Sequence, residues 1–290
     1  MSTLERAPWE FTKMHGLGND YLFCDAIDRP EALPPPAVIR AATDRHTGIG
    51  ADGVIALLPS RVADIRMRIW NADGSEAEMC GNGLRCLVKL AYERGHVHRE
   101  SAMCRVETGA GVLRTWPVWE DGRVVACREE MGVPRLLWPD GAPAGERRLR
   151  WRRPDESVER EHNAIHVSMG NPHLVHFVGG TSDNPDVLRD GPTLEHHPLF
   201  PERVNVGFAQ MIGAAEVSLA VWERGAGATR ACGTGAAACL AAGVATGRLP
   251  RRTRIALPGG SLTGEWPEED GSLFLTGPAA SVGTCRFEPA

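Results

Sequence analysis

The sequence lacks any long hydrophobic run, since no stretch reaches the ~18 apolar residues that a membrane-spanning helix needs. Its first residues, Met1 to Glu10, contain no apolar core of the kind found in secretory signals. An excess of positive charge is also missing, because 32 Lys and Arg stand against 37 Asp and Glu, for a net charge of −5. Nucleic acid and anionic membranes are therefore poor candidate partners. We expect a soluble, cytoplasmic protein.

Motifs for metals and dinucleotides are missing as well. No Cys-x-x-Cys pair and no His-Glu-x-x-His motif occurs, so we predict no metal site and give His162 and His166 no ligand role. Gly48 to Gly53 matches Gly-x-Gly-x-x-Gly, but a helix-like segment precedes it and a strand-like segment, Val54–Leu58, follows. A dinucleotide fingerprint needs the reverse order. We therefore predict no cofactor of either kind.

The chain is nevertheless rich in cysteine and glycine, with eight and 33 residues respectively. Because it is long and shows no secretory signal, we expect reduced thiols rather than disulfides. Hydrophobic residues make up 42% of the 290 residues, which is enough to bury a large core and excludes a wholly disordered chain.

An internal repeat organises the sequence. Cys80 and Cys232 each begin a Cys-Gly-x-Gly motif, and they are 152 residues apart (232 − 80), as are Trp70 and Trp222. The same offset aligns Gly18 with Gly170, Asn19 with Asn171, Val54 with Val206, and Gly95 with Gly247. One ungapped offset over so many positions is hard to obtain by chance. The sequence therefore predicts two homologous halves.

Within each half, strand-like and helix-like patterns follow one another. Ala63–Ile69 and Glu216–Val221 alternate apolar and polar residues, as half-buried strands do. Helical patterns follow each Cys-Gly-x-Gly, over Leu84–Arg94 and Ala236–Thr246, and each ends at a glycine suited to the C′ position; Ala37–Arg45 predicts a further helix. We predict an α+β fold of two pseudo-symmetric domains, each a mostly antiparallel or mixed sheet around a central helix that starts at Cys-Gly-x-Gly.

The junction between the halves has a composition of its own. Pro134–Glu161 is rich in proline and charge, with a run of arginines between Arg147 and Arg153. This composition predicts a solvent-exposed connection with a turn or a ragged strand extension. A basic interaction patch is the less favoured alternative, because acidic residues are interspersed.

A cysteine followed by Gly-x-Gly at a helix start can both bind an anion and react. The first helical turn presents backbone N–H groups without internal partners and the positive end of the helix dipole, so a carboxylate can bind there. We expect the same position to stabilise a thiolate and lower the cysteine pKa. Two such thiols can act on opposite faces of a carbon next to a carboxylate, one removing a proton and the other delivering one. Duplication of the whole motif favours this reading of Cys80 and Cys232 over simple packing, the role that we expect for Cys86 and Cys239.

Several blocks of the sequence together form a specific signature. They are Phe11–Tyr21, Arg45–Gly53, Arg68–Ser75, Cys80–Gly83, Ser168–His173, Val204–Gly207, Glu223–Gly227 and Ala231–Ala236. With these blocks the sequence resembles the diaminopimelate epimerase family over nearly its whole length. The resemblance implies conversion of LL- to meso-2,6-diaminopimelate without a cofactor, in lysine and cell-wall precursor biosynthesis. It also implies a homodimer and a C-terminal strand that returns to the first domain, so that the domains are 1–126 with 277–290, and 127–276.

The resemblance also implies roles for individual positions. Cys80 and Cys232 would be the acid–base pair, and His173 and Glu223 would tune it. The residues that would hold the reacting carboxylate are Gly81, Asn82, Gly233 and Thr234. Those that would line the substrate pocket are Asn19, Asn71, Asn171, Asn205, Glu223 and Arg224. The residue types agree, because asparagine offers both a donor and an acceptor and a guanidinium can bind a carboxylate through two hydrogen bonds.

Three positions depart from the family pattern and leave the substrate preference open. Gly53 stands where some members have a glutamine, and Ala228 and Arg230 differ from the residues common before the second cysteine. One alternative is an amino-acid racemase of the same fold that acts on another substrate, such as histidine or proline. Arg224 and the asparagines favour a substrate with a second charged end, which proline lacks. The other alternative is a non-catalytic thiol redox or metal-binding protein that uses Cys80 and Cys232.

Overall fold

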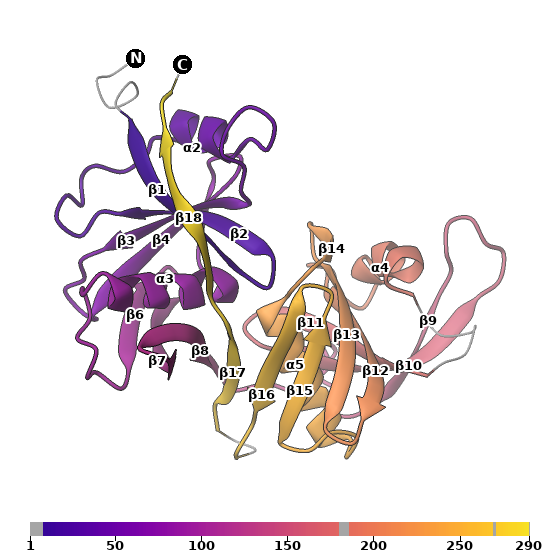
Figure 1. Ribbon diagram of the computed structural model, residues 1–290. Coiled ribbons are helices and arrows are strands. Elements are labelled where there is room, and N and C mark those ends of the chain that lie inside the picture. Colours follow the sequence, from indigo (N-terminus) through magenta and orange to yellow (C-terminus); the bar gives the residue numbers. More distant parts are fainter. Residues whose placement is uncertain (1–7, 180–185, 269–270, 290) are drawn as a thin grey trace. The chain divides into compact units, whose positions relative to one another are not determined.

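The computed structural model describes residues 8–179, 186–268 and 271–289 (Figure 1). The contacts divide the chain into two compact units: unit 1 runs to Glu129 and resumes at Thr276, and unit 2 is Glu130–Leu275. The divisions fall within strands β8 (Arg123–Gly132) and β17 (Leu273–Pro278). The domain boundaries expected from the sequence, 126/127 and 276/277, lie within the same two strands.

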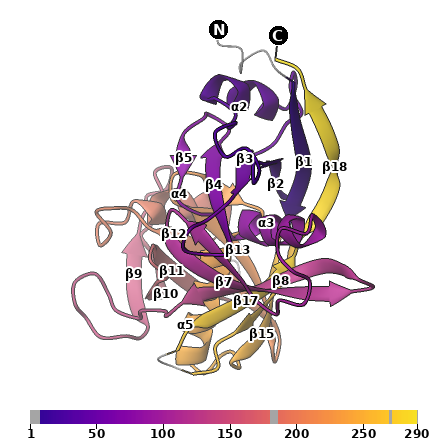
Figure 2. The same cartoon turned by 90° about the vertical axis from the view of Figure 1, so that its left-hand side faces the viewer.

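Unit 1 is a mixed sheet with helices. Its helices are α2 (Pro36–Thr43) and α3 (Gly81–Glu93), and its other strands are β1 (Trp9–Gly16), β2 (Asn19–Asp25), β3 (Gly53–Leu58), β4 (Ile65–Asn71), β5 (Glu76–Ala77), β6 (Cys104–Thr108), β7 (Gly111–Glu120) and β18 (Ala280–Phe287). The pairs β2–β3 and β4–β6 are parallel, whereas β1–β2, β3–β4 and β6–β7 are antiparallel. β18 pairs antiparallel with β1, so the last strand lies beside the first (Figure 2).

Unit 2 repeats this plan. Its helices are α4 (Val187–Glu195) and α5 (Gly233–Ala245), and its strands are β9 (Arg147–Trp151), β10 (Arg160–Ser168), β11 (Pro172–Val178), β12 (Asn205–Gly213), β13 (Glu216–Glu223), β14 (Gly227–Thr229), β15 (Arg252–Leu257) and β16 (Gly260–Glu265). The pairs β11–β12 and β13–β15 are parallel, and β10–β11, β12–β13 and β15–β16 are antiparallel.

The duplication extends to strand register. Tyr21 pairs with Gly53 between β2 and β3, and the residues 152 positions later, His173 and Asn205, pair between β11 and β12. Helices α3 and α5 each have 13 residues and start directly after Cys80 and Cys232. The predicted α+β fold of two homologous halves is therefore confirmed.

Glycine allows close packing on both central helices, of α3 against its sheet and of α5 against the segment that follows it. A Cβ on Gly83 would lie 2.3 Å from Ile55 Cδ1, and one on Gly243 would lie 2.4 Å from Leu249 Cδ1. Because no side chain intervenes, the apolar face of α3 packs directly on β3 in the core of unit 1. Both helices end as predicted, at glycines with positive φ, 77° at Gly95 and 68° at Gly247.

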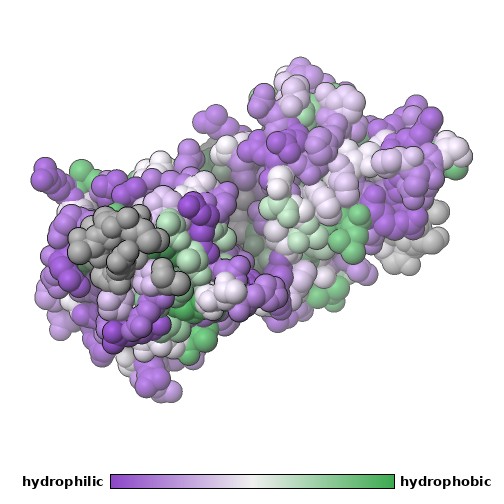
Figure 3. Space-filling view, turned by 90° about the horizontal axis from the view of Figure 1, so that it is seen from above, coloured by the Kyte–Doolittle hydropathy of each residue, from purple (hydrophilic) through white to green (hydrophobic). Residues whose placement is uncertain are grey.

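The other local predictions are confirmed with small shifts. The helix expected over residues 37–45 spans Pro36–Thr43, and the strands expected around residues 63–69 and 216–221 are β4 and β13. Gly48–Gly53 follows helix α2 and leads into strand β3, of which Gly53 is the first residue, and this order is the reverse of a dinucleotide-binding turn. Among the described residues no helix is long and apolar enough to cross a membrane. Hydrophilic residues predominate on the face in Figure 3, and hydrophobic ones form small separate patches.

The expectation of a solvent-exposed connection over Pro134–Glu161 is wrong in part. Trp138 and Trp151 are buried in the core of unit 2, because one face of this segment turns inward. The expected strand extension does occur, as the hairpin of β9 and β10. Arg153 is only 3% exposed and donates hydrogen bonds of 2.7 and 2.6 Å to the two carboxylate oxygens of buried Asp190. This part of the segment is structural core.

Candidate active site

The two cysteines of the repeated motif occupy equivalent positions. Cys80 is the N-cap of α3, with extended backbone angles of φ −143° and ψ 119°. Cys232 is the N-cap of α5, with φ −123° and ψ 110°. These angles are typical of N-caps, where side chains face the free N–H groups of the first turn. Each thiol therefore lies at a helix N-terminus, as the sequence predicts.

In unit 1, three of the candidate residues form one hydrogen-bonded cluster. The Cys80 thiol donates to Asn19 Oδ1 at 3.3 Å, and Asn82 Nδ2 donates to the same oxygen at 3.3 Å. Asn19 lies at the start of β2, and its Nδ2 donates to Asp52 Oδ2 at 2.7 Å. The structure thus places Asn19, Asn82 and, through the chain, Gly81 around the sulfur of Cys80.

A charged group that the sequence analysis missed supports this cluster. Arg45 Nη2 donates to Asp20 at 2.6 Å and to Asp52 at 2.7 Å. Lys13 Nζ lies 3.1 Å from Asp20. Burial opposes ionisation of Asp20, but the hydrogen bonds from Arg45 and Lys13 outweigh it and lower the pKa of this carboxyl. These residues lie within the sequence blocks 11–21 and 45–53, and their membership of these blocks is the sequence feature that could have identified them.

Asn71 and Gly53 lie opposite each other in strands β4 and β3. The exposed Asn71 side chain donates from Nδ2 to Ser75 Oγ at 3.0 Å, within its own turn. A Cβ on Gly53 would lie 2.1 Å from the Trp70 carbonyl oxygen, so this backbone has no room for a side chain at position 53.

In unit 2, a second chain of hydrogen bonds leads to Cys232. Its sulfur accepts from the Gly235 N–H at 3.4 Å and lies 3.6 Å from Thr234 Oγ1. Asn171 Nδ2 donates to Thr234 Oγ1 at 3.3 Å, and Asn171 Oδ1 lies 3.0 Å from His173 Nε2. His173 therefore reaches the thiol through Asn171 and Thr234.

His173 is neutral at physiological pH. It is 1% exposed, and burial, aided by the nearby positive charges of His166 and Arg224, lowers its pKa to about 3. The Asn171 carbonyl oxygen can only accept, so Nε2 of His173 carries the proton. His173 thus orients the Asn171 amide as a hydrogen-bond donor and does not act as a charged group.

The remaining candidates of unit 2 lie around one turn. Asn205 Nδ2 donates to the Pro172 carbonyl at 2.9 Å, and Asn205 Oδ1 accepts from the backbone N–H of Arg224 at 2.9 Å. The exposed Arg224 side chain donates from Nη1 to the Glu202 carbonyl at 2.9 Å, and Glu223 accepts from Thr229 Oγ1 at 2.5 Å.

The buried carboxylate of Glu195, which no sequence motif indicated, holds this turn through hydrogen bonds. Glu195 accepts from Trp222 Nε1 at 2.8 Å and from the Gly225 N–H at 2.9 Å. Ala228 and Arg230, just beyond the turn, are exposed.

The expectation that the helix starts lower the thiol pKa values is wrong for this structure. Burial raises the pKa of Cys80 and outweighs its hydrogen bonds with Tyr21 and the Gly83 N–H. Burial, followed by the neighbouring Glu223, raises the pKa of Cys232 despite the hydrogen bonds from Thr234 and Gly235. The loss of hydration costs the thiolate more than the helix dipole, about half a charge, returns. Both cysteines are therefore thiols at neutral pH.

The other cysteines of the same helices have packing roles, as expected. Cys86 and Cys239 are 1% and 0% exposed, and burial raises the pKa of each to about 12. Within residues 8–179, 186–268 and 271–289, no group of three or more His, Cys, Asp or Glu side chains could hold a metal ion.

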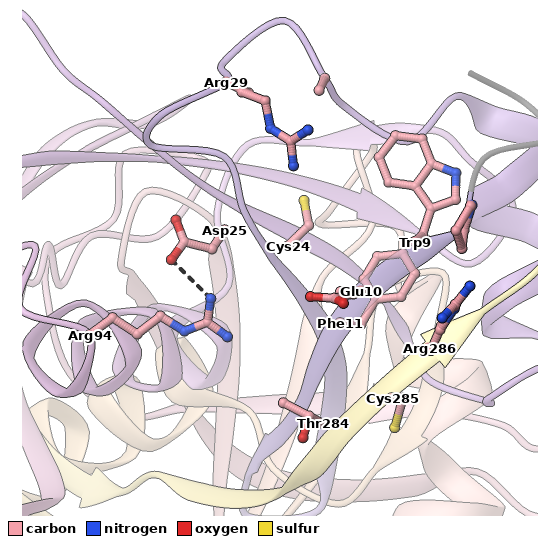
Figure 4. Close-up of a pocket in the computed structure, with 12 residues that line it drawn as sticks. Trp9, Glu10, Phe11, Cys24, Asp25, Arg29, Arg94, Thr284, Cys285 and Arg286 are labelled. Atoms are coloured by element: carbon pink, nitrogen blue, oxygen red, sulfur yellow. Dashed lines mark hydrogen bonds and ion pairs between the residues drawn. The ribbon is translucent and has the colours of Figure 1, made fainter. Parts of the chain in front are cut away.

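A cavity of about 800 Å³ in unit 1 lies away from these clusters (Figure 4). Strands β1, β2 and β18 contribute Trp9, Cys24 and Cys285 to its lining, and Asp25 accepts from Arg94 at 3.0 Å on its wall. None of the candidate residues lines it. The side-chain clusters, and not this cavity, define the candidate site.

Comparison with known proteins decides the family. The model of the diaminopimelate epimerase family matches residues 11–137 and 165–282. The chain belongs to the diaminopimelate epimerase family. Relatives named diaminopimelate epimerase, from Desulforudis audaxviator and Pelotomaculum thermopropionicum, are 45% and 46% identical over 280 and 282 residues, covering 94% of this chain and 97% and 96% of theirs. The resemblance seen in the sequence is confirmed.

Solved structures with much lower identity share the fold. A PhzF-family phenazine biosynthesis protein from Bacillus anthracis has a TM-score of 0.68 at 16% identity, covering 97% of this chain and 99% of its own. A probable proline racemase from Agrobacterium radiobacter has a TM-score of 0.65 at 17% identity, covering 95% of this chain and 92% of its own. At these identities the likeness shows the fold of the diaminopimelate epimerase family and does not bear on substrate.

Proposed function

We propose that this chain is an isomerase that converts LL-2,6-diaminopimelate to meso-2,6-diaminopimelate, in lysine and cell-wall precursor biosynthesis. The observation that carries the proposal is the pair of equivalent cysteine N-caps, one on the central helix of each unit. The substrate follows from the family, because relatives that match nearly the whole chain are named diaminopimelate epimerase.

Cys80 and Cys232 act on opposite faces of the α-carbon. One sulfur, as thiolate, takes the α-proton and becomes a thiol, while the other thiol gives its proton to the opposite face and becomes a thiolate. The N–H groups at the starts of α3 and α5 bind the reacting carboxylate and stabilise the charge that develops on it. Because burial keeps both sulfurs protonated in the free protein, one of them gives its proton to solvent water as the substrate binds.

The other candidate residues bind the substrate and orient these groups. Glu223 and Arg224 suit the ammonium and carboxylate of the distal end. His173 acts through Asn171 and Thr234, as its hydrogen bonds indicate. The reaction needs no cofactor. We also propose a cytoplasmic homodimer without nucleic-acid or membrane partners.

The test is to incubate the protein with LL-diaminopimelate in heavy water and to follow α-deuteration and formation of the meso isomer. Parallel incubations with L-proline and L-histidine test for a racemase of another substrate. Deuteration of either of these, without turnover of diaminopimelate, overturns the substrate assignment. Absence of exchange with every amino acid favours a non-catalytic thiol protein. Added pyridoxal phosphate should change nothing, and light scattering gives the oligomeric state.

A further inference from the structure

A buried ion pair lies directly behind the first turn of α3. Arg85 and Glu129 are 0% and 1% exposed, and Arg85 Nη1 donates to Glu129 Oε1. The other carboxylate oxygen, Oε2, has no hydrogen-bond partner among the described residues and lies 3.2 Å from where a Cβ on Gly81 would be. Buried pairs of this kind seldom stabilise a fold more than apolar residues of similar volume do. The position of the pair against the helix start therefore calls for a role other than stability.

Arg85 fixes the side-chain amide of Asn82. Its Nη2 donates to Asn82 Oδ1. A guanidinium has only donors, so the Asn82 amide must turn its oxygen toward Arg85 and its Nδ2 away from it. That Nδ2 group donates to Asn19 Oδ1 at 3.3 Å.

Two neighbours, Asp52 and Asn82, impose the same orientation on the side-chain amide of Asn19. The carboxylate of Asp52 can only accept, so it holds Asn19 Nδ2, at 2.7 Å. The Asn82 amide holds Asn19 Oδ1. Both constraints aim this oxygen at the Cys80 thiol, which donates to it at 3.3 Å.

Unit 2 has no such ion pair at the equivalent place. The residues 152 positions after Arg85 and Asn82 are Ala237, which is fully buried, and Thr234. Thr234 Oγ1 accepts from Asn171 Nδ2 and so is free to donate to the sulfur of Cys232. The two thiols are therefore supported in different ways, and Cys232 is an internal control for any effect that acts through Arg85.

We propose that Arg85 and Glu129 are positioning residues of the epimerase: they lock the Asn82 amide and thereby hold Asn19 Oδ1 as an acceptor against the Cys80 thiol. The proposal rests on the proposed function only in giving Cys80 a proton-transfer role. Glu129 holds the guanidinium in place and balances its charge. Without the pair, the Asn82 amide can rotate and turn its oxygen toward Asn19 Oδ1, so that only Asp52 still orients the Asn19 amide. An Asn19 amide that turns over against this weaker hold presents an N–H to the sulfur, which favours the thiolate and misdirects the proton.

The test uses a variant in which no buried charge is left without a partner, Arg85→Met with Glu129→Leu. Its fold is checked by circular dichroism and urea unfolding. Arg85→Lys keeps the charge but not the fork that reaches Glu129 and Asn82 together. Arg153→Lys is the matched control, because it alters a buried ion pair of unit 2 that does not contact either cysteine cluster. For each protein, the rate constants of iodoacetamide labelling of Cys80 and Cys232 are measured by peptide mass mapping at several pH values between about 7 and 10, with kcat and KM for diaminopimelate.

The folded double variant should label Cys80 about tenfold faster at a given pH, the gain in thiolate that a pKa lower by about one unit gives, with the Cys232 rate constant unchanged. Its kcat should fall about 10- to 100-fold, the scale of a misplaced reacting group, with KM within about threefold of wild type. Arg85→Lys should shift both quantities in the same direction, and Arg153→Lys should shift neither. An unchanged Cys80 labelling rate constant in the folded double variant overturns the proposal, whatever its activity. Absence of epimerisation by the wild type would refute the proposed function, while the labelling result would still decide this proposal.

Discussion

Replacing Cys80 or Cys232 with alanine should abolish epimerisation, because inversion needs a proton-transfer group on each face of the α-carbon. Loss of one such group typically costs about 10²- to 10⁴-fold in rate. The chain offers matched controls in the same helices, since Cys86 lies in α3 and Cys239 in α5. Alanine at these buried positions also removes one sulfur, but from the core and not from a helix N-cap.

The expected effects on stability and on activity run in opposite directions for the Cys86 and Cys239 variants and for Cys80→Ala. Cys86→Ala and Cys239→Ala each leave a cavity of one heavy atom, which costs about 1 kcal/mol of unfolding free energy, the usual cost of such a deletion. They should keep most of the wild-type activity. Cys80→Ala should cost less stability, because Cys80 is only half-buried, yet it should lose nearly all activity.

The assay follows meso-diaminopimelate formation together with α-deuteration in heavy water, and urea unfolding gives the stability of each variant. If either Cys80→Ala or Cys232→Ala kept more than about a tenth of the wild-type activity, the two-base mechanism would be refuted. Such a variant would have lost less than tenfold in rate, which is less than the smallest loss expected for a proton-transfer group. Equal losses in the Cys86 and Cys239 variants would show that the effect comes from packing.

Three further predictions concern unit 2 and the departures from the family pattern. Arg224→Lys should weaken kcat/KM for diaminopimelate by about 1–3 kcal/mol, the scale of a charged hydrogen bond, and an unimpaired variant would place the distal carboxylate elsewhere. Burial lowers the pKa of His176 to about 3, so between pH 6.5 and 3 the unfolded chain binds the extra proton and stability falls as the pH falls. The free energy of unfolding in urea falls between pH 7 and pH 5, and His176→Phe should make this fall smaller by about 2 kcal/mol. An unchanged fall would contradict the lowered pKa of His176. Gly53→Gln should destabilise the fold, because its Cβ meets the Trp70 carbonyl, and a gain in stability would show that the strand can shift.

The sequence predicts the parts of this protein that depend on local pattern. The offset of 152 residues and the C′ glycines locate both central helices, because caps and repeats leave signals within a few residues. The Arg85–Glu129 pair leaves no such signal, since its members are 44 residues apart and meet only through the fold. The prediction that the cysteine pKa values are lowered is wrong for the same reason. A helix start is visible in the sequence, whereas the burial that outweighs it depends on tertiary packing.

The two halves are alike at some candidate positions and differ at others. The N-capping cysteines and the asparagines at positions 19 and 171 are the same in both halves. The residues 152 positions before Glu223 and Arg224 are Asn71 and Ala72, so only unit 2 has a charged pair at this place. A symmetric substrate end would need two such pairs, but diaminopimelate presents its distal ammonium and carboxylate once. Changes at Arg224 should therefore alter which amino acid is accepted, whereas changes at the N-capping cysteines should lower the rate for every substrate.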